Sequence, residues 1–200
     1  MFVMQQIGFK GMAPLSMQLA AGECVGLGGD SGCGKTRLLR ALADMDEHIG
    51  SVALDGVDAS AMPASQWRKQ VVLLPAESQW WHDTVGEHFS DRQAITPALE
   101  AMGFSEATLG WQLSRCSSGE KQRLAILRLL ANQPRVLLLD EPTANLDPDN
   151  TLRVENLILD YIAANGAACL WVSHNRLQRQ RVARRQLECI GGAFHELADG

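Results

Sequence analysis

The sequence contains no apolar run long enough to cross a bilayer, so it predicts no membrane-spanning helix. It also lacks the features of a signal peptide, because residues 1–10 do not combine a basic start with a following apolar stretch. Internal repeats and low-complexity segments are missing as well. With 200 residues of ordinary composition, the chain is expected to build a proper core, as one large domain or two small lobes.

An excess of basic residues is also missing. The formal net charge is -5 at pH 7, which argues against a general nucleic-acid binder because the phosphate backbone selects basic surfaces. The cysteines form an odd set without a CxxC pair, at Cys24, Cys33, Cys116, Cys169 and Cys189. They predict reduced thiols in a cytoplasm rather than a disulfide framework or a zinc site.

A glycine-rich segment is the most informative feature that is present. It matches the phosphate-binding pattern G-x-x-x-x-G-K-[ST] with Gly29, Asp30, Ser31, Gly32, Cys33, Gly34, Lys35 and Thr36. Its glycines let the backbone curl so that N–H groups point at phosphate oxygens. Lys35 adds a positive charge for the outer phosphates, and Thr36 offers a hydroxyl to Mg²⁺.

A second segment, far downstream, ends a predicted buried strand with two acids. Residues 136–139 are all apolar, and Asp140 and Glu141 follow them. Because α/β folds bind ligands at the carboxyl ends of their strands, Asp140 is expected to reach a metal ion and Glu141 to lie beside the terminal phosphate. Together the two segments predict a protein that binds and hydrolyses a nucleoside triphosphate.

The glycine-rich segment also has plainer interpretations. A glycine-rich turn with one lysine can be only a loop, and short matches occur by chance. The apolar residues 23–28 before it and the helical pattern of residues 36–45 after it favour phosphate binding, because strand, loop and helix place phosphates at a helix N-terminus. Cys33 is either a small space-filling residue, which is the interpretation we favour, or an oxidation-sensitive thiol.

Alternation and turn residues predict the other strands. Residues 3–9 alternate weakly and indicate an edge strand, whereas residues 15–19 alternate clearly and indicate a half-buried strand. A hairpin is expected to turn at residues 55–56. Short buried strands are expected at residues 71–74 and 168–172.

Capping residues predict two long helices. One helix begins with a capping box, in which the Ser117 hydroxyl caps the N–H of Glu120 and the Glu120 side chain reaches back. The other begins at Asp147, followed by a proline, and ends at Gly166. His174 follows the last core strand and is expected at the same edge as the phosphate-binding loop.

Taken together, these segments resemble the ATPase subunit of an ATP-binding cassette (ABC) transporter, and the resemblance covers nearly the whole chain in order. Five motifs carry it: Walker A at 29–36, the signature at 116–123, Walker B at 140–143, the D-loop at 144–147 and the switch-histidine loop at 172–175. Five motifs in register at family-like spacing make another assignment improbable.

The resemblance implies an α/β fold. Its P-loop NTPase core has a mainly parallel sheet flanked by helices, with an N-terminal antiparallel β subdomain and an inserted helical subdomain. Residues 1–76 and 117–200 are then the catalytic core of one ABC ATPase domain. Residues 77–116 are expected to form a mostly helical insertion.

The resemblance also implies a mechanism that needs two copies. They close head to tail, and each ATP lies between Walker A of one copy and the signature of the other. Ser117 and Gly119 then present a helix N-terminus to the γ-phosphate. Glu141 polarises the attacking water, and His174 contacts the γ-phosphate. The third implied catalytic residue is Lys35.

Cofactors, partners and location follow from the same resemblance. ATP is bound with Mg²⁺, for which Thr36 and Asp140 are the expected protein ligands, and Asp147 of the D-loop is expected at the nucleotide. The implied partners are a membrane permease subunit and a second copy of the chain, without nucleic acid. The implied location is cytoplasmic, peripheral at the inner face of the cell membrane.

The chain departs from the family pattern in the loop after the strand at 71–74. Ala76 holds the place of a glutamine that touches Mg²⁺ and the attacking water. Glu77 or Gln79 could substitute if the loop is reshaped. This change puts the metal geometry and the coupling to a membrane partner in doubt.

The signature and the residue expected to stack on adenine also differ from the family pattern. Ser118 stands where the family has glycine, and Glu120 where it often has glutamine. The early strand has no tyrosine to stack on adenine, and Phe9 is expected to pack in the core.

Two further features each allow two interpretations. The adjacent Trp80 and Trp81 are either an interface anchor for a permease or one core residue beside a partly exposed one. A cluster of arginines indicates a solvated helix face, with a contact to lipid head groups or a partner as the minority alternative; its members are Arg176, Arg179, Arg181, Arg184 and Arg185.

The leading hypothesis is therefore a small cassette ATPase that powers transport through a separate permease, with a faint similarity to cassettes of putative metal exporters. One alternative is a cassette that does not transport, although the chain shows neither the long coiled-coil insertions nor the paired cassettes of such relatives. Another is a weakly hydrolysing nucleotide switch. Ala76 and Ser118 favour the switch, and the intact Glu141 and His174 oppose it.

Overall fold

A six-stranded sheet in the order β10-β9-β3-β8-β7-β6 forms the centre of the computed structural model, which describes residues 1–197. All neighbours in it are parallel except β10 and β9. The strands are β3 (Cys24–Gly29), β6 (Val71–Leu74), β7 (Val136–Asp140), β8 (Ala168–Val172), β9 (Arg185–Ile190) and β10 (Ala193–Glu196). The predicted α/β fold with a mainly parallel core sheet is confirmed.

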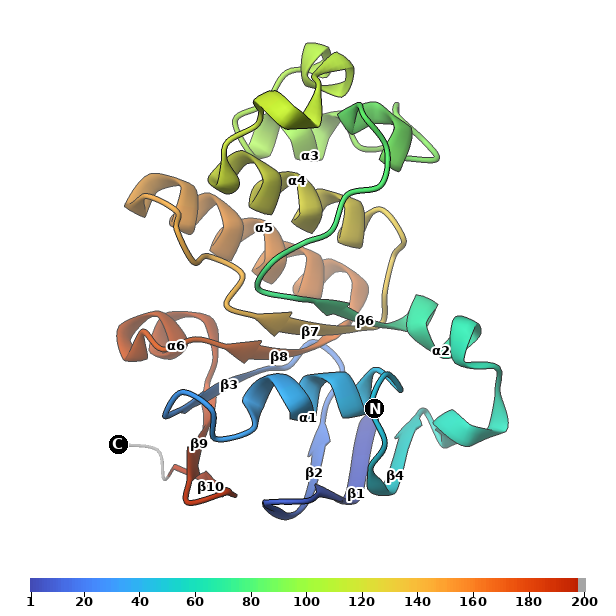
Figure 1. Ribbon diagram of the computed structural model, residues 1–200, viewed down its shortest axis with the longest axis vertical. Coiled ribbons are helices and arrows are strands. Elements are labelled where there is room, and N and C mark those ends of the chain that lie inside the picture. Colours follow the sequence, from blue (N-terminus) through green and yellow to red (C-terminus); the bar gives the residue numbers. More distant parts are fainter. Residues whose placement is uncertain (198–200) are drawn as a thin grey trace.

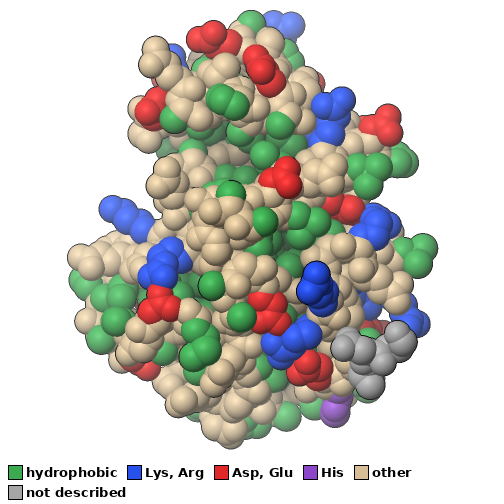
Figure 2. All heavy atoms as spheres, turned by 180° about the vertical axis from the view of Figure 1, so that it is seen from behind, with side chains coloured by type: hydrophobic (Ala, Val, Ile, Leu, Met, Phe, Trp, Pro, Cys, Tyr) green, Lys and Arg blue, Asp and Glu red, His purple; other side chains and the backbone are tan. Residues whose placement is uncertain are grey.

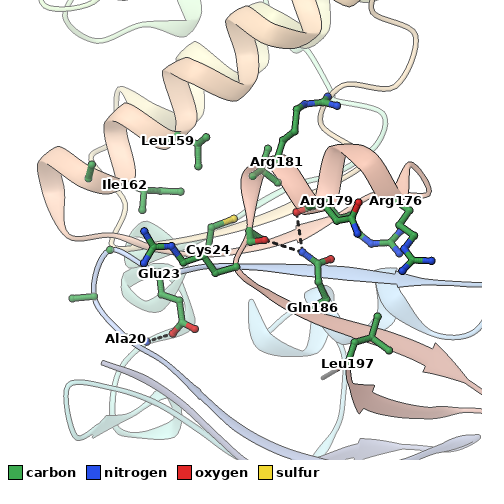
Figure 3. Close-up of a pocket in the computed structure, with 17 residues that line it drawn as sticks. Ala20, Glu23, Cys24, Leu159, Ile162, Arg176, Arg179, Arg181, Gln186 and Leu197 are labelled. Atoms are coloured by element: carbon green, nitrogen blue, oxygen red, sulfur yellow. Dashed lines mark hydrogen bonds between the residues drawn. The ribbon is translucent and has the colours of Figure 1, made fainter. Parts of the chain in front are cut away.

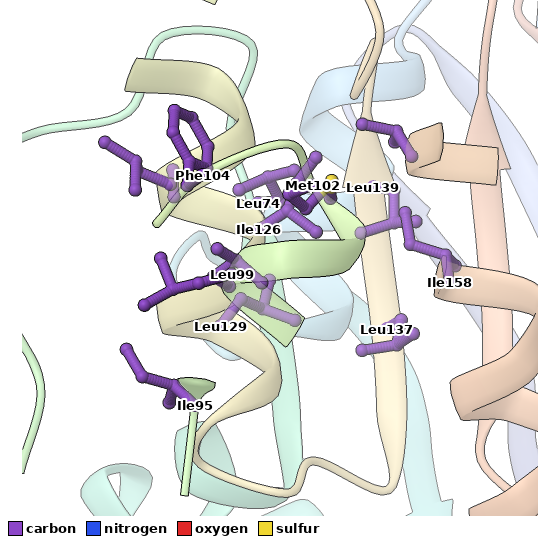
Figure 4. Close-up of a cluster of buried hydrophobic side chains, with 14 of the residues drawn as sticks. Leu74, Ile95, Leu99, Met102, Phe104, Ile126, Leu129, Leu137, Leu139 and Ile158 are labelled. Atoms are coloured by element: carbon purple, nitrogen blue, oxygen red, sulfur yellow. The ribbon is translucent and has the colours of Figure 1, made fainter. Parts of the chain in front are cut away.

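Both faces of this sheet are buried, which explains why its strands read as continuous apolar runs. In β7, Leu137 and Leu139 pack into a cluster with α4 (Ser118–Leu130) and α5 (Pro148–Asn165), as Figure 4 shows. Leu138 between them faces a second cluster with α1 (Lys35–Leu42). Figure 1 accordingly shows α4 and α5 on one side of the sheet and α1 on the other.

A four-stranded antiparallel sheet packs against α1, in the order β2-β1-β4-β5. Its strands are β1 (Phe2–Phe9), β2 (Met12–Leu19), β4 (Ile49–Leu54) and β5 (Val57–Asp58), so the hairpin at Asp55 and Gly56 is confirmed. The prediction that residues 3–9 form an edge strand is wrong, because β1 pairs with both β2 and β4. A bulge with Gln6 at φ 52 shifts the register and breaks the alternation on which that prediction rested.

The capping signals predict the long helices correctly. Ser117 caps α4 in a capping box, Asp147 caps α5, and Gly166 ends α5 at φ 62 in the left-handed region. Outside the segment 77–116, the other helices of the described residues are α2 (Ala64–Gln70), α6 (Arg176–Val182) and a 3-10 turn at Ala59–Ala61. Among the described residues, no helix has the length and apolarity needed to cross a membrane.

The segment 77–116 is less helical than expected. It holds the six-residue α3 (Thr96–Ala101) and 3-10 turns at Val85–His88, Glu106–Gly110 and Leu113–Arg115. Pro97 lies in the first turn of α3, and Gly103, at φ 76, follows its end. Buried side chains such as Leu99 and Met102 nevertheless pack this segment onto α4 (Figure 4).

Charged side chains of both signs lie interspersed on the face of the molecule seen in Figure 2. Acidic and basic groups alternate there, without a continuous surface of one sign.

Candidate functional site

The phosphate-binding loop connects β3 to α1 at the carboxyl edge of the sheet. Gly29, Gly32 and Gly34 have φ of 121, 78 and 112, a region that favours glycine. A Cβ at Gly29 would lie 2.5 Å from the Cys189 carbonyl oxygen of β9, so only glycine fits there. Helix α1 has no side-chain cap and no acid in its first turn, which leaves its N-terminal N–H groups for an anion.

The ammonium group of Lys35 lies under this loop. Its Nζ donates to the carbonyl oxygens of Gly29 at 2.7 Å and Asp30 at 2.8 Å, and it lies 3.6 Å from the Cys33 Sγ. Lys35 is only 7% exposed. Lys35 therefore stabilises the loop by donating to its carbonyl oxygens. A bound phosphate would compete with these oxygens for the ammonium group.

Thr36 and Asp140 meet at the sheet edge. The Thr36 hydroxyl donates to Oδ2 of Asp140 at 2.7 Å, and Asp140 is 5% exposed. A hydroxyl and a carboxylate oxygen side by side suit Mg²⁺, which takes oxygen ligands and usually keeps waters and substrate phosphates besides one or two carboxylates. The described residues contain no group of three or more His, Cys, Asp or Glu side chains placed to hold a metal. The donor set therefore fits Mg²⁺ arriving with a nucleotide.

Glu141 and His174 form a second contact at the same edge. The backbone N–H of His174 donates to Oε1 of Glu141 at 2.8 Å, and the His174 Nε2 lies 3.7 Å from that oxygen. Glu141 has φ 49, an uncommon conformation for a non-glycine residue, and its N–H donates to the Val172 carbonyl of β8. The turn after β7 therefore aims the Glu141 carboxylate at the end of β8.

The environment of Glu141 disfavours its charged form. Burial raises the pKa of the Glu141 carboxyl above its usual range, and the Asp140 carboxylate adds to the rise. The His174 side chain and backbone N–H, and the charge of Lys35, act in the opposite direction. A carboxylate with a raised pKa is a better proton acceptor than a free one, as general-base chemistry requires.

The signature segment lies away from these groups, at the N-terminus of α4. The N–H and hydroxyl of Ser117 both donate to the Glu120 carboxylate, at 2.8 and 2.9 Å, and the Glu120 N–H donates back to the hydroxyl. These bonds lower the pKa of the Glu120 carboxyl. Gly119 packs against the D-loop, where an added Cβ would lie 3.1 Å from Leu146.

Asp147 is occupied as a helix cap. Its carboxylate accepts from the backbone N–H of Asn150 at 2.9 Å and from the Asn150 side chain at 2.6 Å. Those bonds lower the pKa of the Asp147 carboxyl. Asp147 is exposed at the start of α5, and these hydrogen bonds do not connect it to the phosphate-binding loop.

The loop after β6 carries Ala76 as an exposed residue. Its side chain has no atom that could ligate a metal. Gln79 contributes its backbone carbonyl to Arg128 of α4 at 3.0 Å. The Arg128 guanidinium also stacks over Trp80 and Trp81, 4.3 and 4.6 Å from the ring centroids.

The two tryptophans differ in burial. Trp80 packs against the core under α4, whereas Trp81 is 66% exposed. The prediction of one core residue beside an exposed one therefore agrees with the structure, and the exposed ring of Trp81 still leaves room for a contact with a partner.

Phe9 packs partly against the core cluster under the antiparallel sheet, as expected, and also borders the phosphate-binding loop. A Cβ at Gly34 would lie 3.5 Å from the ring, and the Arg37 guanidinium stacks on it at 4.3 Å. An aromatic ring with a cationic side chain stacked on it therefore lies next to the phosphate-binding loop.

The prediction of a solvated arginine face is wrong for Arg179, which is buried, whereas Arg176, Arg181 and Arg184 are exposed and Arg185 belongs to β9. Arg179 is 4% exposed, and it donates to the Ser173 carbonyl at 2.6 Å and to Glu188 at 2.9 Å. Arg181 pairs with the buried Glu155, and Arg185 pairs with Glu23 and Glu196. Each acidic partner lies on a different element, at least 9 residues away, so helical periodicity gave no sign of it.

Sequence reasoning also missed Gln178. Its amide nitrogen donates to the Thr143 hydroxyl at 2.7 Å and to the Glu155 carboxylate at 2.8 Å. It thereby ties the segment after Glu141 to α5 and α6. Nothing in the sequence marks this glutamine, because its role depends on contacts between three elements.

A cavity of about 1400 Å³ lies elsewhere, between α5, α6 and the turn before β3. Figure 3 shows Leu159 and Ile162 of α5 on one side and Arg176 and Arg179 of α6 on another. None of the phosphate-loop residues, Asp140, Glu141 or His174 lines it.

Comparison with known proteins agrees with this arrangement. The sequence model of the ABC transporter family matches residues 12–144. The chain is 30% identical over 189 residues to the "Probable iron export ATP-binding protein FetA" of Escherichia coli, with 86% of this chain and 84% of FetA covered. It is 35% identical to "Protein STAR1" of Oryza sativa over 88% of this chain, and spans 54% of that longer protein.

The fold has a similar solved counterpart. The dimeric, ADP- and phosphate-bound structure of the ATP-binding cassette MJ0796 superposes with a TM-score of 0.83 at 20% identity, covering 99% of both chains. At this identity the likeness shows the fold, and the matched sequence model shows the family.

Proposed function

Because this chain belongs to the ABC transporter family, we propose that it binds ATP and hydrolyses it to power transport through a separate membrane permease. One observation carries the proposal: the Thr36–Asp140 and Glu141–His174 contacts lie at the same sheet edge as the phosphate-binding loop. The residues needed to hold a triphosphate and to activate water are therefore already close together in the single chain.

The phosphates would bind to the loop and to the N-terminus of α1. Uncapped backbone N–H groups of this helix supply donors, and Lys35 supplies a charge that its carbonyl partners release to a phosphate oxygen. Phe9 and Arg37 at the mouth of the loop offer a flat apolar surface and a cation to the base. This pair would hold the nucleotide without a tyrosine.

Mg²⁺ would be held by Thr36 and Asp140 with oxygens of the nucleotide, and when bound it neutralises charge on the phosphates. Glu141 would orient the attacking water and accept its proton, for which its raised pKa suits it. His174, 57% exposed, would turn its ring toward the γ-phosphate while its N–H keeps Glu141 in place.

A second copy of the chain would complete the site. The signature lies at the start of α4, and the phosphate-binding loop lies at the start of α1, on the opposite side of the central sheet (Figure 1). We propose that two chains close head to tail, so that the α4 N-terminus of one faces the nucleotide of the other.

The permease contact and the location follow from the same proposal. The loop after β6 exposes Trp81, held by Arg128 and His88, and a large ring fixed at the surface is a suitable anchor for a partner. The chain would then sit on the cytoplasmic side, peripheral to the membrane that contains its permease.

The test is size-exclusion chromatography of Glu141→Gln with and without Mg-ATP. Without the carboxylate, hydrolysis stops and the ATP-bound dimer should accumulate, whereas the exposed Glu100→Gln variant should behave like the wild type. A Glu141→Gln protein that binds ATP and stays monomeric would refute closure of two identical chains.

A nucleotide switch with little hydrolysis is the second candidate, and the observation that favours it is Ala76 in the loop after β6. The two candidates differ in turnover. A wild-type chain that binds ATP tightly but hydrolyses it no faster than Glu141→Gln would support the switch. Faster turnover in Ala76→Gln would then identify the missing side chain as the cause.

A further inference from the structure

Two cysteines from distant parts of the chain meet under the phosphate-binding loop. The Cys189 Sγ of β9 donates to the backbone carbonyl of Cys33 at 3.1 Å. Cys33 belongs to the loop itself. In the sheet, Cys189 is the register partner of Gly29, where the loop begins.

The two thiols differ in access. Cys33 is partly exposed, and its Sγ lies 3.6 Å from the Lys35 ammonium, whereas Cys189 is 1% exposed. Burial raises the pKa of the Cys189 thiol to about 12, so this thiol is protonated and unreactive toward a reagent from solvent. Such a reagent therefore reacts with Cys33 first, and the neighbouring Cys189 is the thiol that can react with the oxidised Cys33.

We propose that Cys33 and Cys189 form a dithiol that a peroxide converts into a disulfide, and that this disulfide stops the loop from binding nucleotide. The second half rests on the proposed function, since it concerns the same ATP site. The first half concerns only the two sulfurs.

The chemistry takes two steps. The Cys33 sulfur attacks one peroxide oxygen, the O–O bond breaks, and a sulfenic acid and one water are formed. The Cys189 sulfur then attacks the Cys33 sulfur, its proton leaves with the sulfenic oxygen as a second water, and the S–S bond forms. Two thiols lose two electrons and two protons, and the peroxide takes them up.

The bond would move the loop rather than the strand. A disulfide holds its sulfurs about 2.0 Å apart, much closer than a thiol hydrogen bond. Cys189 is fixed in β9 by its pairing with β3 and β10. Cys33 would therefore be drawn toward β9, and Lys35 and the loop N–H groups would leave the positions from which they reach phosphate, where hydrogen bonds tolerate only a few tenths of an ångström.

The chain contains its own comparison pair. Cys24 and Cys169 are register partners in the neighbouring strands β3 and β8. Cys169 is fully buried in the core and belongs to no binding loop. A Cys24→Ser variant removes this pair and should leave the peroxide response of the ATP site unchanged.

The experiment treats the full, reduced chain with hydrogen peroxide and measures two quantities. Peptide mapping by mass spectrometry detects the disulfide, because trypsin leaves Cys33 in peptide 11–35 and Cys189 in peptide 186–200. Peptide 11–35 also contains Cys24, so the same linked peptide in the Cys24→Ser variant identifies Cys33 as the linked cysteine. Binding of a fluorescent ATP analogue reports the site. We expect the linked peptide to appear, the affinity to fall at least tenfold, and dithiothreitol to reverse both changes.

Cys189→Ser separates the disulfide from simple oxidation of Cys33, and Cys189→Ala serves if the serine variant is unstable. Either variant should bind the analogue like the reduced wild type and keep its affinity in peroxide. Equal loss of affinity in the variant, or no linked peptide in the wild type, would overturn the dithiol. A linked peptide with unchanged affinity would overturn its effect on binding.

The two proposals fail in different ways. A reduced wild type that binds no ATP analogue would overturn the proposed function and the regulatory half together. The linked peptide would still decide whether Cys33 and Cys189 form a dithiol.

Discussion

The hydroxyl of Thr36 donates to Oδ2 of Asp140 at 2.7 Å, although 104 residues separate the two in the sequence. This bond closes the space between the first turn of α1 and the end of β7. It brings together the two oxygen atoms that would hold Mg²⁺ beside the phosphates. The contact also gives a hydrogen-bond partner to a carboxylate that is 5% exposed.

Asp140→Asn should slow ATP hydrolysis about 100-fold, because it removes the charge that attracts the metal while keeping a hydrogen-bond acceptor for Thr36. Its ATP affinity should also lose most of its dependence on Mg²⁺, measured by titrating the fluorescent analogue with and without magnesium. The exposed Asp149→Asn at the start of α5 is the matched control. Normal magnesium dependence in Asp140→Asn would place the metal elsewhere.

Lys35→Met should lower both the stability of the protein and its affinity for ATP. Without nucleotide, the Gly29 and Asp30 carbonyls lose a charged donor, so the free energy of unfolding should fall by about 1–2 kcal/mol in urea denaturation. With nucleotide, affinity for ATP should fall because the outer phosphates lose their cation. The exposed Lys69→Met in α2 should change neither quantity, and an Lys35→Met protein with wild-type affinity would contradict the assignment.

Arg179→Met should destabilise the fold more than any exposed arginine variant. It leaves Glu188 without its partner and removes the donor to the Ser173 carbonyl, so we expect a loss of about 2–4 kcal/mol in urea denaturation. Arg179→Met combined with Glu188→Gln should recover part of that loss, since no unpaired charge then remains. Equal stability of single and double variants would show that the ion pair carries little energy.

His88 should make stability depend on pH. Its Nε2 accepts the N–H groups of Trp81 and His82, both at 3.2 Å, so the ring must be neutral there. Burial lowers the pKa of the His88 imidazole, and the charges of Arg128 and His82 lower it further, against a hydrogen bond to Thr84 that raises it.

Because the folded state resists protonation, the unfolded state takes up more protons as the pH falls below about 6.5. The stability that neutral His88 contributes is therefore complete above that pH and is lost as the pH falls toward the lowered value. Urea denaturation between pH 7.5 and 5 should show this slope in the wild type and a smaller one in His88→Gln. The exposed His195→Gln should leave the slope due to His88 intact.

Local signals in the sequence were the reliable ones. The capping box at Ser117 and the N-cap at Asp147 appear in the structure as expected, because each depends on residues three positions apart. The phosphate-binding loop is equally local, since its glycines and Lys35 fix its shape within one turn of chain. Such features need no knowledge of the rest of the fold.

Errors occurred where distant contacts decide. The bulge at Gln6 interrupts the alternation of β1, so the sequence did not indicate that this strand lies between two others. The short helices of the segment 77–116 are held by packing on α4, which is far away in the sequence for most of them. The sequence did not show that Arg179 of α6 is buried, because its acidic partner Glu188 comes from β9. An ion pair across elements leaves no periodic trace in the sequence.

The sequence by itself determined the local motifs and their order along the chain, and from them it predicted which residues carry the chemistry. Residue type and short spacing suffice for that, because a phosphate loop or a helix cap is made by neighbours. Only the tertiary structure decided that Thr36 meets Asp140, that Glu141 meets His174 and that Cys33 meets Cys189. These contacts arise when parallel strands align their carboxyl ends in one sheet, which burial of both its faces enforces.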